Sequence, residues 1–170
     1  MTNDIRIPFG ACDITYGDVI LPTMADEAVF QAIPSYSPLY GGAGNTIQKY
    51  ILESYEVTFT VLINHESYET LKLHSPTLKN HVNGLYDNAS DVDMTGKRLV
   101  IHPQGNGDSK EFDLCIWDAY VSPETGFTRT FKKEADTFEI KFVGKPTNLI
   151  DDGNSYFFIG DWEQAGVINE

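Results

Sequence analysis

Apolar and polar residues alternate through the stretch Gly96–Lys145, around which the rest of the chain is organised. In its last run, three apolar residues at alternate positions take one side of an extended chain and charged residues take the other. A period of two residues is typical of half-buried strands. Short polar or glycine-bearing links between the runs predict an antiparallel meander. The predicted strands are Lys97–His102, Glu111–Val121, Phe127–Lys132 and Phe138–Phe142.

The strongest strand signal of the N-terminal half is Thr46–Ile63, which is rich in β-branched and aromatic residues. It predicts either one long strand or two strands with a bend near Glu53. A strand of this length projects beyond a small sandwich, and projecting strands usually pair with a neighbouring subunit. Two further strands are expected at Ala11–Val19 and Ala25–Tyr36. The second of these is ambiguous between helix and strand, and we choose strand because prolines punctuate its end.

One helix is expected, over Asn64–Leu78, with Asn64 as its cap and Pro76 marking its end. A single helix among strands usually covers one open face of a sandwich. Lys79–Thr95 is predicted to be a polar connection with an Asn-Gly turn. The segment Gly160–Glu170 is expected to be a polar tail that carries one exposed aromatic side chain, Trp162.

The segment Ser35–Asn45 is predicted to be a flexible loop, because its glycines disfavour regular structure. Its ending, Gly-Asn-Thr, lacks the lysine of a phosphate-binding loop, so nucleotide binding is not expected. A flexible loop with apolar and aromatic side chains suits docking against another protein chain. The candidate contact residues are Tyr36, Leu39, Tyr40, Gly41, Gly42 and Gly44, together with Trp162.

The chain has 170 residues, a size that fits one domain with a substantial core. Its 12 basic and 25 acidic residues give a net charge of −13. An acidic surface repels nucleic-acid phosphates, so it indicates either simple solubility or a surface past which DNA moves without sticking. No apolar run is long enough to span a bilayer, and the N-terminus does not resemble a signal peptide, so we expect synthesis inside a cell and no membrane partner.

No constellation of residues predicts catalysis. The chain has no Gly-x-Ser-x-Gly nucleophile elbow, and its four histidines lack metal-binding spacing. Cys12 and Cys115 show no zinc or disulfide spacing, and Cys115 is expected to be a buried small apolar residue. Calcium is a minor alternative for the acids of the Lys79–Thr95 connection, which do not match a twelve-residue calcium loop. We therefore expect no enzyme, no cofactor and no metal. The four histidines are His65, His74, His81 and His102, and the acids of the connection are Asp87, Asp91 and Asp93.

The order of several weak motifs resembles the major tail proteins, or tail tube proteins, of long-tailed bacteriophages. No single motif is specific, but together they cover most of the chain. The segment Pro34–Asn45 departs from the family pattern, which leaves the contact between rings open. The resemblance rests on Phe9–Gly17, Gly96–Pro103, Asn106–Lys110, the strand through Trp117, Phe138–Phe142 and Phe158–Asp161.

The resemblance implies a mainly β fold, an antiparallel β-sandwich or partial barrel flanked by one α-helix. Six copies would form a ring whose inner sheets join into a closed barrel, and stacked rings would form the conduit for genome ejection in a virion tail assembled in the host bacterial cytoplasm. The implied partners are further copies, the tape measure, tail terminator and distal tail proteins, and DNA that passes without tight binding. One domain would span residues 1–170, with an N-terminal arm (about 1–10), an inter-ring loop (about 35–48) and a C-terminal arm (about 160–170).

The acidic balance suggests that lumen carboxylates push DNA away from the tube wall, with Glu56 and Glu139 as candidates. Three alternatives stay open at this point. One is the ring protein of a contractile secretion system, which shares the architecture. Another is a monomeric β-sandwich that binds a carbohydrate or protein through Trp117 and Trp162. The third is a small β-sandwich enzyme.

Overall fold

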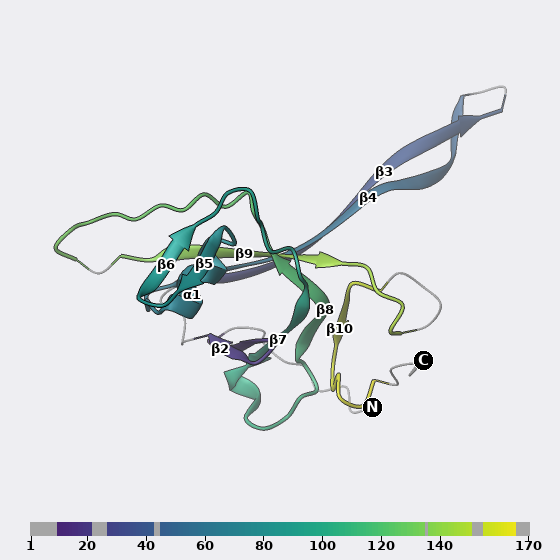
Figure 1. The fold of residues 1–170 in the computed structure, drawn as a ribbon. Helices are drawn as coiled ribbons and strands as arrows, with labels where there is room; N and C mark the ends of the chain where they lie inside the picture. Colours follow the sequence, from purple (N-terminus) through teal and green to yellow (C-terminus); the bar gives the residue numbers. More distant parts are fainter. Residues whose placement is uncertain (1–9, 22–26, 43–44, 135, 151–154, 166–170) are drawn as a thin grey trace.

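The computed structural model describes residues 10–21, 27–42, 45–134, 136–150 and 155–165 (Figure 1). Over these residues the fold is mainly β with one α-helix, as the sequence predicted. The predicted N-terminal arm lies almost entirely outside the described residues. The elements are β1 (Cys12–Tyr16), β2 (Val19–Leu21), β3 (Ala28–Gly41), β4 (Thr46–Ile63), α1 (Tyr68–His74), β5 (Leu78–His81), β6 (Gly84–Asp87), β7 (Lys97–Pro103), a 3-10 turn (Gln104–Asn106), β8 (Leu114–Val121), β9 (Phe138–Lys145) and β10 (Phe157–Ile159).

The main sheet has eight strands, and every neighbouring pair is antiparallel. Its order is β2-β1-β7-β8-β9-β4-β3, with β10 also on β8. Because β7 occupies one edge of β8, the other edge is shared by β10 at Leu114–Ile116 and by β9 at Asp118–Val121. β8 therefore has three partner strands, and the eight strands form a sandwich-like body that does not close into a barrel within the described residues of the single chain.

The core lies on the side of the sheet where the alternating apolar residues of β4, β7 and β9 meet. Phe142 is fully buried, and the Tyr16 ring lies 4.9 Å from its ring, centroid to centroid. The Tyr16 hydroxyl donates to the Ala119 carbonyl oxygen at 3.0 Å, so its polar end is satisfied inside the core. Gly144 lets β9 pass close to its neighbours, because a Cβ there would lie 3.1 Å from Ile116 and 3.3 Å from Val57. The apolar rows predicted for these three strands are confirmed.

Helix α1 is shorter than the predicted Asn64–Leu78 and begins at another cap. The Ser67 side chain accepts from the Thr70 N–H at 3.1 Å, and the Thr70 hydroxyl oxygen accepts from the Ser67 N–H at 2.8 Å. This capping box starts the helix after Ser67, so the prediction of Asn64 as cap was wrong. The helix packs on β9 through His74, whose Nδ1 donates to the Glu139 carbonyl oxygen at 2.6 Å.

The predicted loop Ser35–Asn45 is mostly strand in the structure. β3 pairs with β4 from Ala28 through to Gly41, and only the turn between Gly41 and Thr46 remains outside the ladder. The prolines did not end the strand because β3 is the edge of the sheet, where missing N–H groups are tolerated. β4 is one long strand with a register shift at Glu53, which resolves the two alternatives that the sequence left open.

Two further predictions were wrong. Phe127–Lys132 alternates like a strand but pairs with no strand in the described part of the chain. The connection Lys79–Thr95 holds the two-stranded hairpin β5–β6, whose turn is Val82-Asn83. Here Gly84 has a positive φ of 159° at the start of β6.

We predict that two isoleucine-to-alanine substitutions have very different effects on stability. Ile140→Ala removes a side chain that is fully buried in β9, so it should lower the free energy of unfolding by about 2–5 kcal/mol. Ile51→Ala removes a side chain that is 46% exposed on the hairpin, so the change should stay within about 0.5 kcal/mol. Urea unfolding of dilute protein measures both. Equal losses would contradict this division between body and hairpin.

Candidate assembly surface

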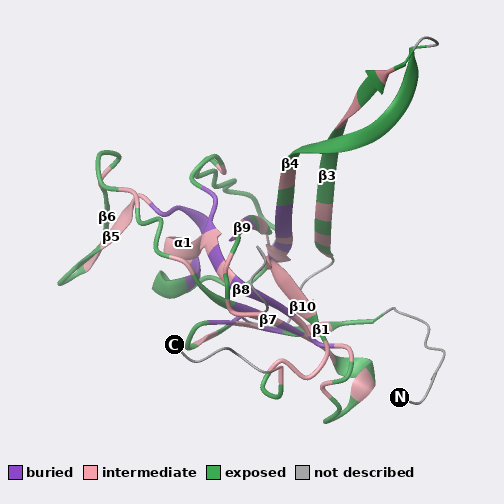
Figure 2. Ribbon diagram, turned by 90° about the vertical axis from the view of Figure 1, so that its right-hand side faces the viewer, coloured by how far each residue is buried: buried purple, intermediate pink, exposed green. Residues whose placement is uncertain are grey.

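The β3–β4 hairpin has two halves in different environments. The half near the body pairs with β9 and carries core residues: Val57, Phe59 and Val61 are at most 2% exposed. The distal half pairs only with itself and extends away from the body, as Figure 1 shows at the upper right. Figure 2 shows the same change along β4, from buried to exposed.

The register shows which side chains share a face of the hairpin. Residues directly opposite each other in an antiparallel pair point to the same side, and successive residues alternate. The core-facing row of the body therefore continues into the pairs Tyr36–Leu52, Pro38–Tyr50 and Tyr40–Ile47. Five of these side chains, which we call the apolar strip, are exposed: Tyr36 (55%), Tyr40 (52%), Ile47 (47%), Tyr50 (61%) and Leu52 (52%).

The opposite face of the distal hairpin is more polar. It carries Ser35, Ser37 and Lys49, and the Ser37 hydroxyl donates to the Glu53 carboxylate. Leu39, Ile51 and, nearer the body, Ile33 are the exposed apolar residues of this face. The hairpin is thus amphipathic, with its apolar strip in line with the core.

The structure brings some of the predicted contact residues together and separates others. Tyr36 and Tyr40 belong to the apolar strip, whereas Leu39 and Gly41 fall on the opposite face. Gly42 lies in the turn with a positive φ of 79°, which favours glycine. Gly44 lies outside the described residues.

Three members of the strip were not predicted as contact residues, although they belong to the predicted strand Thr46–Ile63: Ile47, Tyr50 and Leu52. A usable signal was present, since apolar residues crowd this part of the strand without a clear alternation. The register shifts near Glu53 and Tyr40 disturb the period of two and hide the shared face.

Trp162 lies away from the hairpin and is half-buried, so the prediction of an exposed side chain was wrong. The Arg98 guanidinium lies 4.7 Å from its ring centroid and the Lys110 ammonium 5.7 Å, and Lys110 also pairs with Glu163 at 2.6 Å. These cation–π contacts hold the C-terminal segment on the body. Trp117 is 5% exposed, so these two tryptophans do not form an open ligand platform.

Glu56 and Glu139 lie on one open face of the sheet, opposite the core. The register places Lys141 on the same face, where its Nζ is 3.9 Å from the Glu56 carboxylate. This face therefore holds both signs of charge close together. That Glu56 and Glu139 line a lumen stays a prediction.

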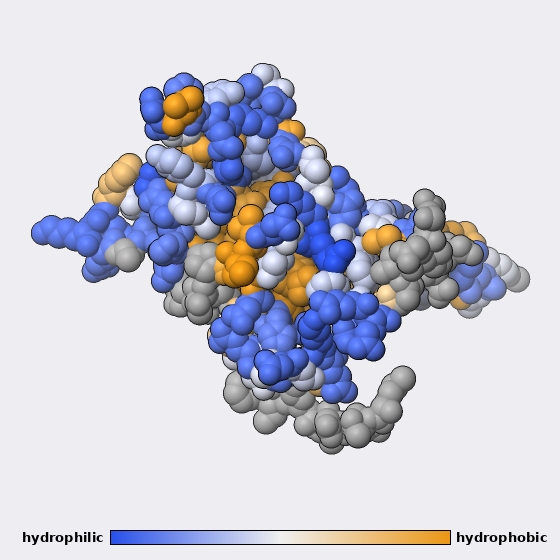
Figure 3. Space-filling view, turned by 60° about the horizontal axis from the view of Figure 1, so that its bottom comes forward, coloured by the Kyte–Doolittle hydropathy of each residue, from blue (hydrophilic) through white to orange (hydrophobic). Residues whose placement is uncertain are grey.

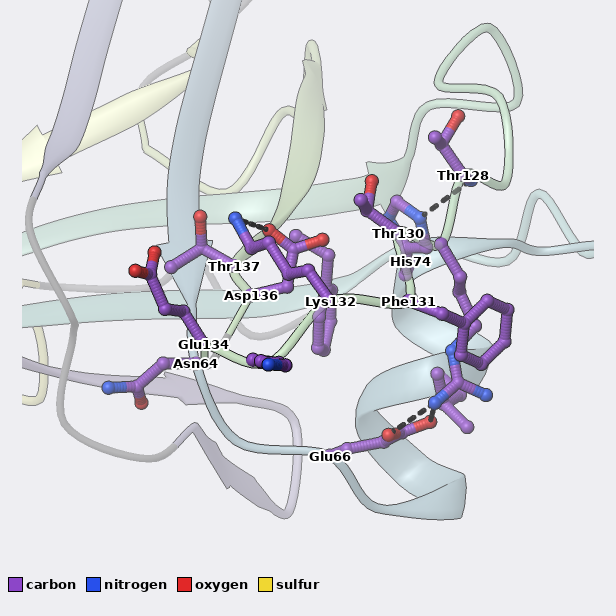
Figure 4. A pocket seen from close by; sticks show the side chains of 14 residues that line it. Asn64, Glu66, His74, Thr128, Thr130, Phe131, Lys132, Glu134, Asp136 and Thr137 are labelled. Carbon is purple, nitrogen blue, oxygen red and sulfur yellow. Dashed lines mark hydrogen bonds and ion pairs between the residues drawn. The ribbon is translucent and has the colours of Figure 1, made fainter.

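A groove of about 550 Å³ lies between α1 and the connection from β8 to β9 (Figure 4). Its histidine is already engaged, because His74 Nδ1 donates to Glu139 and Nε2 accepts from the Thr128 N–H at 3.5 Å. Arg129 pairs with Glu66 at 2.5 Å, and Lys132 pairs with Asp136 at 3.1 Å. The charged groups of the groove are thus largely paired with one another.

The two cysteine thiols lie in environments that disfavour the reactive thiolate. Cys115 is fully buried as predicted, and burial raises its thiol pKa to about 12. Burial likewise raises the Cys12 pKa to about 11.

Within the described ranges, no group of three or more His, Cys, Asp or Glu residues is placed to hold a metal ion. No helix in the described chain is long and apolar enough to cross a membrane. Figure 3 shows a largely hydrophilic face of the molecule with hydrophobic atoms gathered near its centre.

His102 joins β7 to the start of β8 and to the 3-10 turn. Its Nδ1 donates to Asp113 Oδ1 at 2.6 Å, and its Nε2 donates to the Gly107 carbonyl oxygen at 2.7 Å. Two oxygen acceptors require two N–H donors, so the imidazolium form satisfies both contacts. The hydrogen bond to the buried Asp113 carboxylate raises the His102 pKa, and Asp13, its partner across the β1–β7 pair, acts in the same direction.

Two solved structures share this fold. One is titled the anti-feeding prophage cap (AFP tube terminating cap), with 11% identity, 92% of this chain and 95% of that chain covered, and a TM-score of 0.52. The other is the sheath/tube terminator, in the extended state, of an extracellular contractile injection system (PVC), with 10% identity, 94% and 100% covered, and a TM-score of 0.54. At these identities the similarity establishes the fold. No protein-family model and no curated protein matches the sequence.

The His102 contacts predict a pH-dependent contribution to stability. Because the folded-state pKa is raised, the contribution is complete below the unfolded pKa near 6.5 and is lost as the pH rises through the folded pKa. The loss of unfolding free energy caused by His102→Gln should therefore be larger at mildly acidic pH than at alkaline pH. Urea unfolding of both proteins across this range measures the difference. A pH-independent loss would contradict the imidazolium assignment.

Proposed function

We propose that this chain is a structural subunit of a phage tail or a phage-like injection apparatus, and that its copies assemble into a ring. The observation that carries the proposal is the apolar strip, which continues the core face beyond the body without a cover. The fold shared with two terminator subunits supports the same assignment. The resemblance to tail tube proteins, reached from different features, agrees with it.

The distal half of the β3–β4 hairpin is long and has no neighbouring strand in the described residues. A two-stranded hairpin with no third strand or covering layer is marginally stable in water. This one also exposes five large apolar side chains in a single row, where a soluble monomer usually carries scattered ones. If a second copy packs on the hairpin, it both supports the isolated two-stranded hairpin and removes the apolar strip from water. A contact in which the hairpin of one copy meets a different surface of the next would be heterologous, and such a contact generates a ring or a filament.

Two positions in the apparatus fit this role. The similarity to a tube terminating cap and to a sheath/tube terminator favours a terminator, for which we expect a single ring at the end of a tube. The sequence resemblance favours a tube subunit, whose hexameric rings stack into the conduit. Electron microscopy of concentrated protein separates them, since a terminator gives single rings and a tube subunit gives filaments. Stacking, DNA passage and the other tail proteins as partners stay predictions.

Removing the apolar strip should prevent assembly. The double variant Ile47→Ser/Leu52→Ser deletes two strip residues that are 47% and 52% exposed and makes no hole in the core. We expect it to remain folded but to lose assembly by more than about tenfold in concentration, because buried apolar anchors dominate interfaces. Sedimentation velocity and electron microscopy measure this.

The matched control changes the opposite face of the same hairpin. Leu39→Ser/Ile51→Ser removes apolar side chains that are 44% and 46% exposed, and it should assemble nearly as well as the original protein. If both doubles assemble normally, or if the original protein stays monomeric at high concentration, the proposed function is wrong.

A further inference from the structure

The distal hairpin has two free edges, and they are not equivalent. Among the described residues, β3 is the last strand of the sheet, and no strand pairs with its outer edge. β4 pairs with β9 from Thr58 to Ile63, and over Thr46–Val57 its edge away from β3 has no partner strand in the same described ranges. Each edge presents backbone groups to which a strand from another chain can bond.

The prolines of β3 remove hydrogen-bond donors from its outer edge. They also show which backbone N–H groups of β4 point away from β3. Opposite residues in an antiparallel pair either exchange hydrogen bonds or direct their backbone groups away from each other. Pro34 and Pro38 have no N–H, so their pairs with Tyr55 and Tyr50 are of the second kind. The β3 edge therefore lacks donors at both prolines. The N–H groups of Tyr50 and Tyr55 therefore point outward from β4, where no strand of the described chain pairs with them.

The molecule also contains a strand-like segment that pairs with no strand in the described ranges. In Phe127–Lys133, the bulky side chains of Phe127, Arg129 and Phe131 alternate with Thr128 and Thr130, as in strands, yet the whole segment is exposed and none of it lies in a ladder. In the described part of the chain, its one backbone hydrogen bond to the rest of the domain is the Thr128 N–H to His74. Phe131 is 88% exposed.

We infer that Phe127–Lys133 of one copy adds as a strand to the free Thr46–Val57 edge of β4 in a second copy. This inference rests on the proposed function, because it names the partner surface within the same ring. Strand addition would satisfy the unpaired backbone groups of both elements.

Charge and apolar character support a second copy as the occupant. The chain is strongly acidic, yet the segment holds Arg129, Lys132 and Lys133, which are three of its 12 basic residues. The β4 edge carries Glu53 and Glu56 against one lysine. Two exposed phenylalanines accompany the basic residues of the segment, and the apolar strip accompanies the acidic residues of the edge. The two elements are therefore complementary in backbone, charge and apolar surface.

Their places in the fold suit a head-to-tail contact. Figure 1 shows the β8–β9 connection at the far left and the distal hairpin at the upper right, so they lie at opposite ends of the molecule. A contact between two different, opposed surfaces repeats around a ring when its rotation closes. Within one chain the segment stays held beside α1 by the Arg129–Glu66 ion pair.

Disulfide trapping between two copies tests the inference. In a Cys12→Ser background, Thr128→Cys, Thr130→Cys and Lys132→Cys proteins are each mixed with a Ser54→Cys protein under assembly conditions and oxidised. The control partner is Ser35→Cys. Ser35 lies directly opposite Ser54 at the same level of the hairpin, but it belongs to β3 and not to β4. A disulfide requires closely spaced Cβ atoms, so only the adjacent strand reacts efficiently. We expect at least one mixture with Ser54→Cys to give several-fold more crosslinked dimer than its Ser35→Cys counterpart.

Proline substitution gives a second readout. Tyr50→Pro removes the outward N–H that the added strand would use, while Tyr50→Ala removes only the side chain. We expect the proline variant to assemble at least about tenfold more weakly than the alanine variant, with the monomer fold of both intact. At the blocked edge, Tyr36→Pro and Tyr36→Ala should assemble equally.

The outcomes separate this inference from the proposed function. Rings that form without preferential crosslinking to Ser54→Cys, and with equal Tyr50→Pro and Tyr50→Ala assembly, overturn the strand addition and leave the ring subunit standing. A protein that forms no assembly at any concentration overturns both.

Discussion

The structure depends on one apolar face of β4 that extends beyond the body of the domain into the distal hairpin. In β4, the row of Val57, Phe59 and Val61 closes the core against β9. The same row runs on through Leu52, Tyr50 and Ile47, where the body has ended. Apolar burial favours the first half within one chain, and the second half gains the same stabilisation only when another chain covers it. Folding and assembly therefore use two parts of one continuous surface.

The body is built to hold this hairpin rigidly. β8 joins β7 on one edge and both β9 and β10 on the other, so the strands that anchor β4 are themselves fixed from several sides. Close packing at Gly144 and the satisfied Tyr16 hydroxyl leave little freedom around β9. The His102–Asp113 contact and the Trp162 cation–π contacts tie the connecting segments to the same scaffold. A rigid base of this kind presents the distal strands in one direction.

Much of this fold could be predicted from the sequence, and the parts that could not have physical reasons. The rows of β4, β7 and β9 were found because half-buried strands alternate strictly. The Ser35–Asn45 prediction was wrong because glycines and prolines were interpreted by their local preference, while an exposed sheet edge accepts both. Phe127–Lys132 has the pattern of a strand, but no strand in the described part of the chain pairs with it. The apolar strip was predicted only in part, because the register shift at Glu53 interrupts the two-residue alternation of apolar side chains along β4.

Radical footprinting of the tyrosine side chains tests the central claim most directly. Tyr36, Tyr40 and Tyr50 are all more than half exposed in the single chain, and Tyr86, which lies on the separate β5–β6 hairpin, is 48% exposed. If a second copy covers the apolar strip, the three strip tyrosines lose reactivity on going from dilute to concentrated, assembled protein, while Tyr86 keeps its reactivity. Strip tyrosines that remain as reactive in the assembled protein as in the dilute one would contradict the account.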